Sequence, residues 1–169
     1  MEFIDENIMQ YAESLLQDEG LPVEWRSEAL LNGARSALAL NDSASAKLYY
    51  TQVTAEIKGE AQAESNYYLA HFEYVQSKYE ASNERIFWMI DNLPTYPQWR
   101  WKSLLLMAKN YAGLQDDFQA NYTLDYIIDN AEGAIVGEAQ QFKSDLTRRR
   151  AAEEAQAQIS DTLEVAPTA

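Results

Sequence analysis

The chain has 169 residues, of which 47% are hydrophobic, and it contains 6 Gly, 4 Pro and no Cys. This composition suffices for a buried core and favours long helices, and the absence of Cys excludes disulfides and thiolate metal sites. The net charge is -14, and residues 1–25 and 153–169 carry seven and four acids respectively but no Lys or Arg. Because phosphate backbones and anionic lipids attract clustered basic side chains, we expect neither nucleic acid nor a membrane surface as a partner.

Apolar residues recur three and four positions apart throughout the chain, and no window shows the period of two that strands require. We therefore predict an all-α fold. In the first predicted helix, Ala12 and Leu16 lie 34 residues before Ala46 and Tyr50, which is the spacing expected for the second helix of a preceding repeat. We expect residues 1–22 to hold such an orphan second helix and the chain to be a fragment of a longer protein.

Three pairs of small residues follow, and the two members of each pair are twelve positions apart. The pairs are Ala34 with Ala46, Ala70 with Ser82, and Ala108 with Ala120, and they recur at steps of 36 and 38 residues. Only a small side chain lets two helix backbones approach closely, so each pair predicts the crossing point of a helix hairpin. We predict three repeats, at 27–60, 63–96 and 101–134, and Ser43 is the expected N-cap of the second helix in the first repeat.

The small and apolar positions of these units resemble the tetratricopeptide family, whose repeat is a helix hairpin of about 34 residues. The matching residues of the first unit are Leu30, Gly33, Ala34, Ala37, Ala46, Tyr50 and Val53, and those of the third are Leu104, Met107, Ala108, Tyr111, Ala120, Leu124 and Ile127. The resemblance implies a right-handed α-solenoid of tetratricopeptide-type hairpins. The middle unit departs from the pattern, because Asn66 and Glu73 occupy positions that are usually apolar. The sequence leaves the register of this unit undetermined by one residue.

The C-terminal part begins like another first helix, with Ile135, Ala139 and Phe142 at the matching positions. The helical pattern then continues through Leu146, where a repeat would turn. We predict a capping helix at 135–159, followed by a disordered tail at 160–169.

The segment Trp101–Asn130 carries a more specific resemblance, in the strings Ser103–Ala108 and Asp116–Ala120. It is similar to the C-terminal portion of large envelope-associated bacterial tetratricopeptide proteins. The resemblance implies a location in the periplasm or cell envelope and a role in protein binding. The chain itself shows no targeting signal, and it has no run of about 18 apolar residues that could insert directly into a membrane.

Motifs for chemistry are absent from the sequence: there is no phosphate-binding Gly-rich loop with Lys, no zinc-binding His-Glu-x-x-His and no nucleophile elbow. His71 is the only histidine, so it has no second His with which to share a metal. Asp125 and Asp129 lie one helical turn apart, a spacing that is common on solvated helix faces. We expect no catalytic residue, metal or cofactor, and hence no enzyme.

Basic residues occupy the ninth position of each first helix, which faces the concave groove in tetratricopeptide proteins. They are Arg35, His71 and Lys109, and neighbouring groove positions hold Leu31, Leu38, Tyr67, Tyr74 and Leu105. Bases that alternate with apolar surface predict a site for an acidic segment or a C-terminal carboxylate of a partner polypeptide. The alternative is internal pairing with acids on the same helices, namely Glu28, Glu64 and Glu73.

Two functions are consistent with this pattern. The first is a protein-protein interaction scaffold that binds a partner polypeptide through the concave groove. The second is a structural spacer or self-assembling segment of a longer repeat protein, with no separate ligand.

Overall fold

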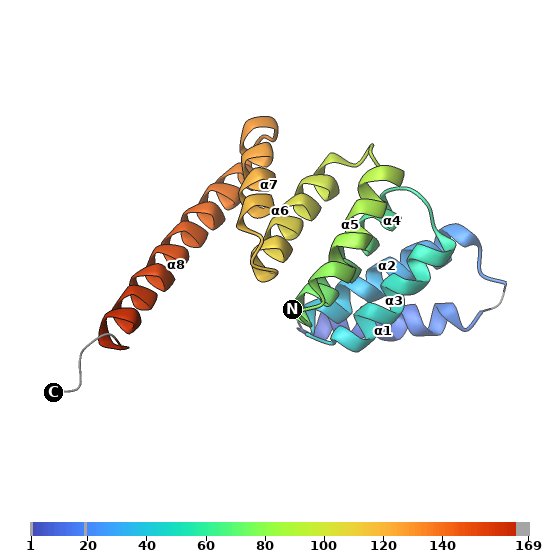
Figure 1. The fold of residues 1–169 in the computed structure, drawn as a ribbon. Coiled ribbons are helices and arrows are strands. Elements are labelled where there is room, and N and C mark those ends of the chain that lie inside the picture. The colour runs from blue at the N-terminus through green and yellow to red at the C-terminus, as the bar shows by residue number, and fades with distance from the viewer. Residues whose placement is uncertain (1, 19, 165–169) are drawn as a thin grey trace.

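The computed structural model describes residues 2–18 and 20–164 and contains, within them, eight helices and no strand (Figure 1). The helices are α1 (Glu2–Leu16), α2 (Val23–Ala39), α3 (Ser43–Glu56), α4 (Glu60–Val75), α5 (Tyr79–Asn92), α6 (Pro97–Gly113), α7 (Asp117–Asn130) and α8 (Ala134–Glu164). The predicted all-α fold is thereby confirmed. Among the described residues, none of the helices combines the length and apolarity that a membrane-spanning segment needs.

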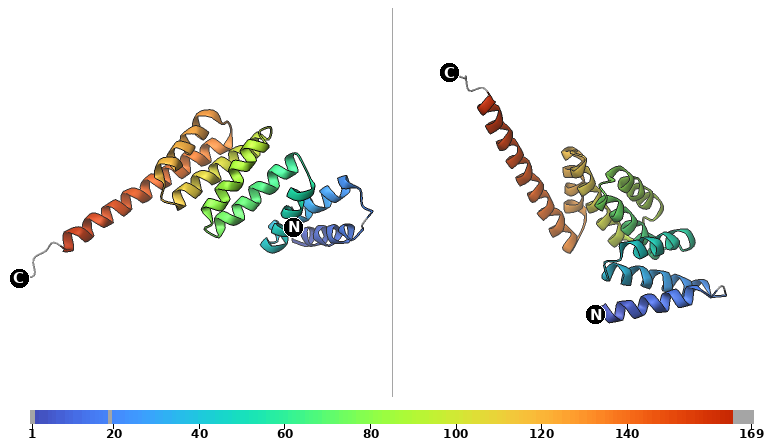
Figure 2. Two further views of the ribbon diagram at one scale, coloured as in Figure 1. Left: turned by 45° about the vertical axis from the view of Figure 1, so that its right-hand side comes forward. Right: turned by 90° about the horizontal axis from the view of Figure 1, so that it is seen from below.

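The helices pack in chain order. Each one contacts the next along the sequence, and α4 also contacts α6 while α6 contacts α8. The successive helices form an arc, from which the C-terminal half of α8 projects (Figure 2). As a result, residues far apart in the chain meet only where neighbouring helix pairs touch.

The predicted crossings are buried as expected. Ala34, Ala46, Ala70, Ser82, Ala108 and Ala120 are all 0% exposed. At the middle crossing the Ser82 hydroxyl donates a hydrogen bond of 2.9 Å to the backbone carbonyl of Ala70. A serine therefore replaces alanine there without leaving an unpaired polar atom.

The turns inside the three hairpins share one geometry. The second residue after each first helix has a positive φ, which is 59° at Asn41, 57° at Ser77 and 62° at Gln115. The next backbone N–H returns to a carbonyl five residues earlier: Asp42 to Ala37 at 2.8 Å, Lys78 to Glu73 at 2.9 Å and Asp116 to Tyr111 at 2.9 Å. This is the Schellman arrangement, which satisfies carbonyls at a helix end. Because the same turn ends α2, α4 and α6, the chain passes from the first to the second helix in the same way in all three hairpins.

The second helices of the first and third hairpins begin at an aspartate cap. Asp42 accepts a hydrogen bond of 3.1 Å from the backbone N–H of Ser45, and Asp116 accepts one of 3.0 Å from that of Gln119. The prediction that Ser43 caps α3 was therefore wrong by one residue, because the aspartate before it reaches the free N–H group.

The core consists of two main clusters, one across α2, α3 and α4 and the other across α4 to α8. Trp99 joins them at the start of α6. It is 7% exposed, and its ring centroid lies 5.7 Å from that of Tyr67 and 6.1 Å from that of Tyr68.

Each predicted repeat contains most of one helix pair: α2 and α3 fall in 27–60, α4 and α5 in 63–96, and α6 and α7 in 101–134. The first and last helices, α1 and α8, correspond to the predicted orphan and capping helices. At its far end α8 continues to Glu164, past the predicted limit of the capping helix at 159. The remainder of the predicted tail, 165–169, lies outside the described residues.

Candidate functional site

A small cavity of about 120 Å³ lies where α4, α6 and α8 meet. We call it the inner groove, and its lining residues are Tyr67, His71, Tyr74, Lys102, Leu105, Leu106, Lys109, Ile135 and Glu138. Five residues predicted for the groove are therefore brought together, namely Tyr67, His71, Tyr74, Leu105 and Lys109. The other four come from the first turn of α8 and from neighbouring positions of α6.

Aromatic side chains form a continuous row along α4 in the inner groove. The His71 ring centroid lies 6.4 Å from that of Tyr67 and 6.1 Å from that of Tyr74. Beside this row, the Lys102 ammonium is 4.6 Å from the ring centroid of Trp99. This distance is within the range of a cation–π contact.

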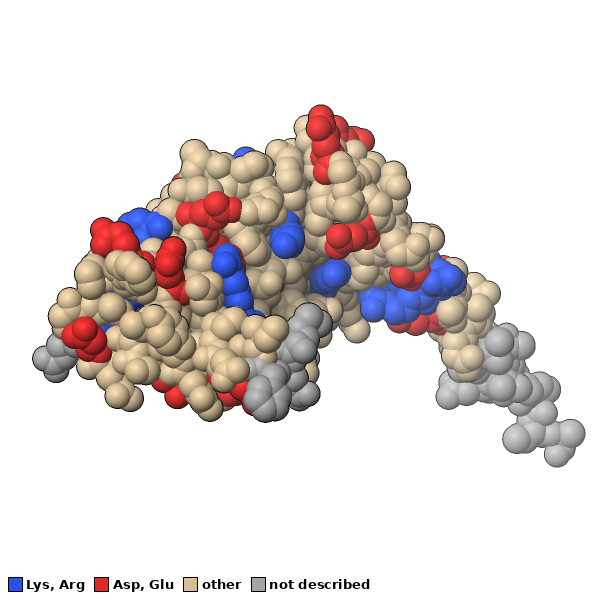
Figure 3. Space-filling view, turned by 180° about the vertical axis from the view of Figure 1, so that it is seen from behind, with Lys and Arg blue, Asp and Glu red and all other residues tan. Residues whose placement is uncertain are grey.

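The lysines of the inner groove have no carboxylate partner in the part of the chain that the structure describes. Neither Lys102 nor Lys109 belongs to an ion pair among the described residues. The Lys109 ammonium lies 5.9 Å from the ring centroid of Phe142 instead. In a space-filling view, basic side chains border a hollow near the middle of the molecule (Figure 3).

Burial and, to a smaller extent, the charge of Lys109 lower the pKa of His71 below its ordinary value. Because that ordinary value is about 6.5, His71 is neutral at pH 7. The charge of the inner groove at pH 7 therefore comes from two lysines and Glu138.

Arg35 is placed differently from the other two basic residues. Its guanidinium donates two hydrogen bonds to Glu64, of 2.7 Å from Nε and 2.5 Å from Nη2. The Glu64 side chain is only 4% exposed, and it also accepts a hydrogen bond of 3.4 Å from the buried Tyr50 hydroxyl. The bond to Glu64 raises the pKa of Arg35. Arg35 is thus paired internally, but with an acid of α4, whereas the alternative to a ligand contact expected an acid on its own helix.

The three predicted groove residues of α2 do not line the inner groove. Leu31 and Leu38 pack against the core cluster of α2, α3 and α4, and Arg35 links α2 to α4. The predicted site is therefore divided, with its α4 and α6 members around one cavity and its α2 members outside it.

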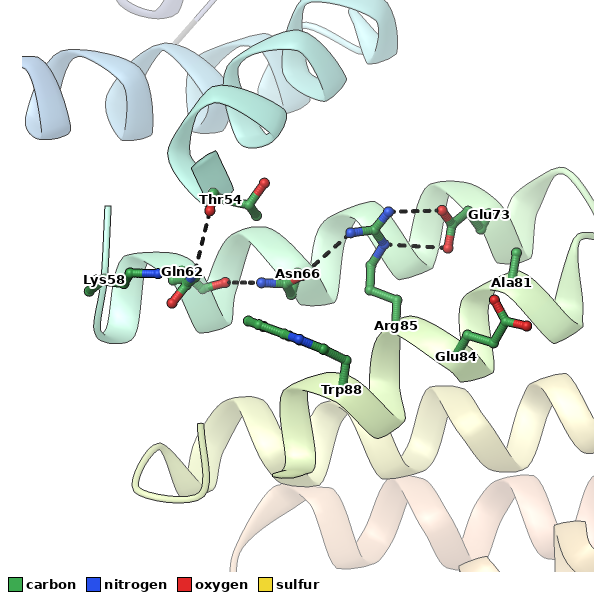
Figure 4. Close-up of a pocket in the computed structure, with 9 residues that line it drawn as sticks. All are labelled: Thr54, Lys58, Gln62, Asn66, Glu73, Ala81, Glu84, Arg85 and Trp88. Atoms are coloured by element: carbon green, nitrogen blue, oxygen red, sulfur yellow. Dashed lines mark hydrogen bonds and ion pairs between the residues drawn. The ribbon is translucent and has the colours of Figure 1, made fainter. Parts of the chain in front are cut away.

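A larger cavity, of about 500 Å³, lies on α3, α4 and α5 (Figure 4). We call it the polar cavity, and its lining residues are Thr54, Lys58, Gln62, Asn66, Glu73, Ala81, Glu84, Arg85 and Trp88. Apart from Ala81 and Trp88, every lining side chain is polar. Such a lining is unusual beside a helix core, where polar groups must find partners.

Hydrogen bonds connect most of the polar side chains on this wall. The Gln62 amide donates to the Thr54 carbonyl at 3.3 Å, and the Asn66 amide donates to the Gln62 carbonyl at 2.8 Å. Arg85 donates to the Asn66 side-chain oxygen at 3.4 Å and to both Glu73 oxygens at 3.2 and 3.5 Å. Asn66 is only 4% exposed, so these bonds compensate its removal from water.

The sequence contained a signal for the polar cavity. Asn66 and Glu73 are the two residues that break the apolar pattern of the middle repeat, and both line this cavity. Their common partner Arg85 could not be recognised from the pattern, because it lies on the other helix of the hairpin. The middle unit keeps its packing because Arg85 pairs with both exceptions.

Comparison with known proteins finds no matching family model, no similar curated protein and no matching solved structure. The tetratricopeptide resemblance therefore stays a prediction. Within the described ranges, no group of three or more His, Asp or Glu side chains is placed to hold a metal ion.

Proposed function

We propose that this protein is a protein-protein interaction scaffold that binds an acidic segment or a C-terminal carboxylate of a partner polypeptide in the inner groove. The observation that carries the proposal is the pair Lys102 and Lys109, which line this groove in no ion pair with any described residue. Lys109 is partly buried and Lys102 is exposed, and a hydrogen bond from either ammonium to a carboxylate is charge-assisted and therefore strong.

The surroundings of the lysines suit a peptide. Tyr67, Tyr74 and Leu105 supply apolar area next to the charges, and recognition of extended peptides combines charge pairing with such contacts. Two lysines against Glu138 give the groove a positive balance in a chain whose net charge is -14. An acidic ligand is therefore attracted to this part of the surface and repelled by most of the rest.

The proposed scaffold is a right-handed solenoid of tetratricopeptide type, in a protein of the periplasm or cell envelope. The equivalent turns after α2, α4 and α6 and the three buried small-residue crossings support the repeat. The location rests on the sequence resemblance.

Charge reversal tests the proposal. A short fluorescein-labelled polyglutamate peptide serves as the probe, and the double variant K102E/K109E is compared with K47E/K78E, which changes two exposed lysines outside the groove by the same charge. Fluorescence anisotropy should show a loss of affinity of about tenfold or more for K102E/K109E and a change of about twofold or less for the control. Equal losses in the two variants, or no binding to the wild type, would contradict the proposal.

The pH dependence provides a second test. A carboxylate bound beside His71 raises its pKa, so binding takes up a proton and strengthens as the pH falls from about 7.5 to about 5.5. The variant H71Q should bind at pH 7.5 like the wild type but lose most of this strengthening. A wild-type affinity for polyglutamate that does not change over this range would exclude contact with His71.

A specific observation favours the second candidate function, a self-assembling spacer. An apolar cavity of about 320 Å³ lies between α1 and α2, and its lining residues Tyr11 and Trp25 are 64% and 58% exposed. Self-assembly through this surface predicts a mass that rises with concentration in analytical ultracentrifugation and falls to that of a monomer in Y11E/W25E. A constant monomer mass in the wild type would exclude it.

A further inference from the structure

The polar cavity continues into a second cavity of about 310 Å³ along the start of α4. The two share Lys58, Gln62 and Trp88 in their linings, and the second adds Asn92, Thr95 and Tyr96 among others. From Gln62 to Glu73 the wall follows α4 for about 16 Å, at a rise of about 1.5 Å per residue. Together the cavities form one elongated polar cleft, separate from the inner groove.

Side-chain amides and hydroxyls form much of the wall of this cleft. Gln62, Asn66 and Asn92 each carry a planar head with both donors and an acceptor, and Thr54 and Thr95 add hydroxyls. The Gln62 side-chain oxygen accepts no hydrogen bond from a described residue, although Gln62 is only 4% exposed. A ligand with hydroxyl groups, which also donate and accept, matches such walls.

The charges in the polar cavity balance. Lys58 and Arg85 stand against Glu73 and Glu84, in a chain whose net charge is -14. Arg85 is already held by Glu73. This balance disfavours phosphates and other strongly charged ligands and favours a neutral one.

An exposed aromatic ring completes the cleft. Trp88 is 43% exposed and belongs to both cavities, and its ring lies along the wall that carries Gln62 and Asn66 (Figure 4). Sugar rings have an apolar C–H face that packs on flat aromatic rings, while their hydroxyls point to the sides. Peptides, by contrast, use apolar pockets for anchoring side chains, and the larger cavity offers only Ala81 and Trp88 as apolar residues.

We propose that this cleft is a binding site for a neutral oligosaccharide. The sugar ring stacks on Trp88, and its hydroxyls pair with the Gln62 side-chain oxygen and with the exposed amide of Asn92. The site lies on α3, α4 and α5 and on the loops before α4 and after α5, and it shares no lining residue with the inner groove.

The experiment uses two probes of different chemistry, maltohexaose and N-acetylchitohexaose, each added to about 10 mM, which detects dissociation constants in the millimolar range. Two-dimensional ¹H–¹⁵N NMR follows the indole N–H of Trp88 and the side-chain amides of Gln62 and Asn66. At least one sugar should shift these signals, with smaller or no shifts for Lys102 and Lys109.

Two tryptophan variants give the matched control. W88A should weaken sugar binding by about tenfold or more, whereas W25A, which removes an exposed tryptophan outside the cleft, should change it by about twofold or less. The variant K58Q/E84Q keeps the cleft neutral and should bind the sugar within about threefold of the wild type, which tests the charge argument without removing the aromatic ring.

Three results would overturn the inference. One is the absence of shifts at the cleft with both sugars, and another is binding that W88A leaves intact. The third is a capped oligoglycine peptide that shifts the same signals at lower concentration than either sugar, because the cleft would then be a peptide site.

Discussion

The polar cavity and the next groove along the molecule occupy equivalent places in consecutive helix pairs, but their linings differ. The second, the aromatic groove, has a volume of about 280 Å³ and is lined by Phe87, Leu104, Met107, Tyr111, Gln119, Tyr122, Thr123 and Tyr126. Residues 38 positions apart correspond: Asn66 to Leu104, Glu73 to Tyr111, Arg85 to Thr123, and Trp88 to Tyr126. One groove is thus lined by amides and ions, and the other by aromatic and aliphatic side chains.

The comparison of the two linings shows that a helix pair requires a buried crossing of small residues but tolerates either polar or apolar residues beside it. Both pairs keep a buried small-residue crossing, Ala70 with Ser82 and Ala108 with Ala120. Beside the crossing, Leu104 fills its position by packing in the core cluster, while Asn66 fills the equivalent position by hydrogen bonds. The fold accepts a polar residue at this position because the Asn66 amide is hydrogen-bonded through both its nitrogen and its oxygen.

The largest expected effect comes from placing a polar side chain in the aromatic groove. L104N puts an amide beside Met107, Phe87 and their neighbours, where Thr123 takes the place of Arg85. We expect a loss of about 3 kcal/mol in the free energy of unfolding, from the lost packing and the unpaired amide. Urea unfolding followed by circular dichroism measures this loss.

The reverse exchange, N66L, is the control for that prediction. It removes a buried amide but leaves Arg85 paired with Glu73, so the free energy of unfolding should change by less than about 1 kcal/mol. Similar losses in the free energy of unfolding for L104N and N66L would mean that the aromatic groove does not reject a polar side chain more strongly than the polar cavity rejects an apolar one.

A smaller effect is expected from removing the central cation of the polar cavity. R85A leaves Glu73 and the Asn66 oxygen without their donor, and both side chains are largely buried. We expect a loss of about 2 kcal/mol, less than for a fully buried pair because the Arg85 side chain is 32% exposed. Chemical denaturation of R85A and of the equivalent T123A, with an expected loss of less than about 1 kcal/mol, provides the comparison.

The double variant E73L/R85L distinguishes the pair from its separate members. With both charges removed together, no unpaired ion remains, and the stability should return to within about 1 kcal/mol of the wild type. A loss in the double variant as large as the loss in R85A would show that Arg85 acts through Asn66 or through its packing rather than through Glu73.

The same two helix pairs show how far the sequence predicts the structure. The crossings at Ala70 and Ala108 followed from spacing alone, because a small residue at a regular interval has one structural reason. Asn66 and Glu73 were recognised as exceptions because they occupy positions of the repeat that are usually apolar. Their partner Arg85 was not recognised, since the choice of partner depends on how two helices are turned toward each other.

The inner groove shows the corresponding limit for the candidate site. His71 and Lys109 were predicted from their equivalent positions, and the structure places both beside one cavity. Lys102 and Glu138 were missed: Lys102 lies outside the repeat positions assigned to the groove, and Glu138 comes from α8, which breaks the repeat. Internal pairing was weighed only with acids on the same helix, and the pairing of Arg35 on α2 with Glu64 on α4 was not predicted, because the charge pattern of one helix does not identify a partner on another.

The smallest expected effect concerns the crossings, where the polar and apolar pairs differ by one hydroxyl. Ser82 accepts a hydrogen bond of 2.8 Å from the amide of Asn110, which is 0% exposed and also donates to Asn83 at 2.8 Å. S82A removes one of these two acceptors, and we expect a loss of about 1 kcal/mol in the free energy of unfolding.

A double-mutant cycle identifies the origin of that loss. If the loss comes from the bond to Asn110, S82A should cost less in an N110A background, with a coupling energy of about 0.5 kcal/mol or more. The matched exchange A120S puts a hydroxyl in the apolar cluster with Ala112 and Leu146, so it should not stabilise the protein. Denaturation curves that give S82A the same cost with and without Asn110 would assign the effect to the Ala70 carbonyl, and the polar character of the middle crossing would then be local to its own hairpin.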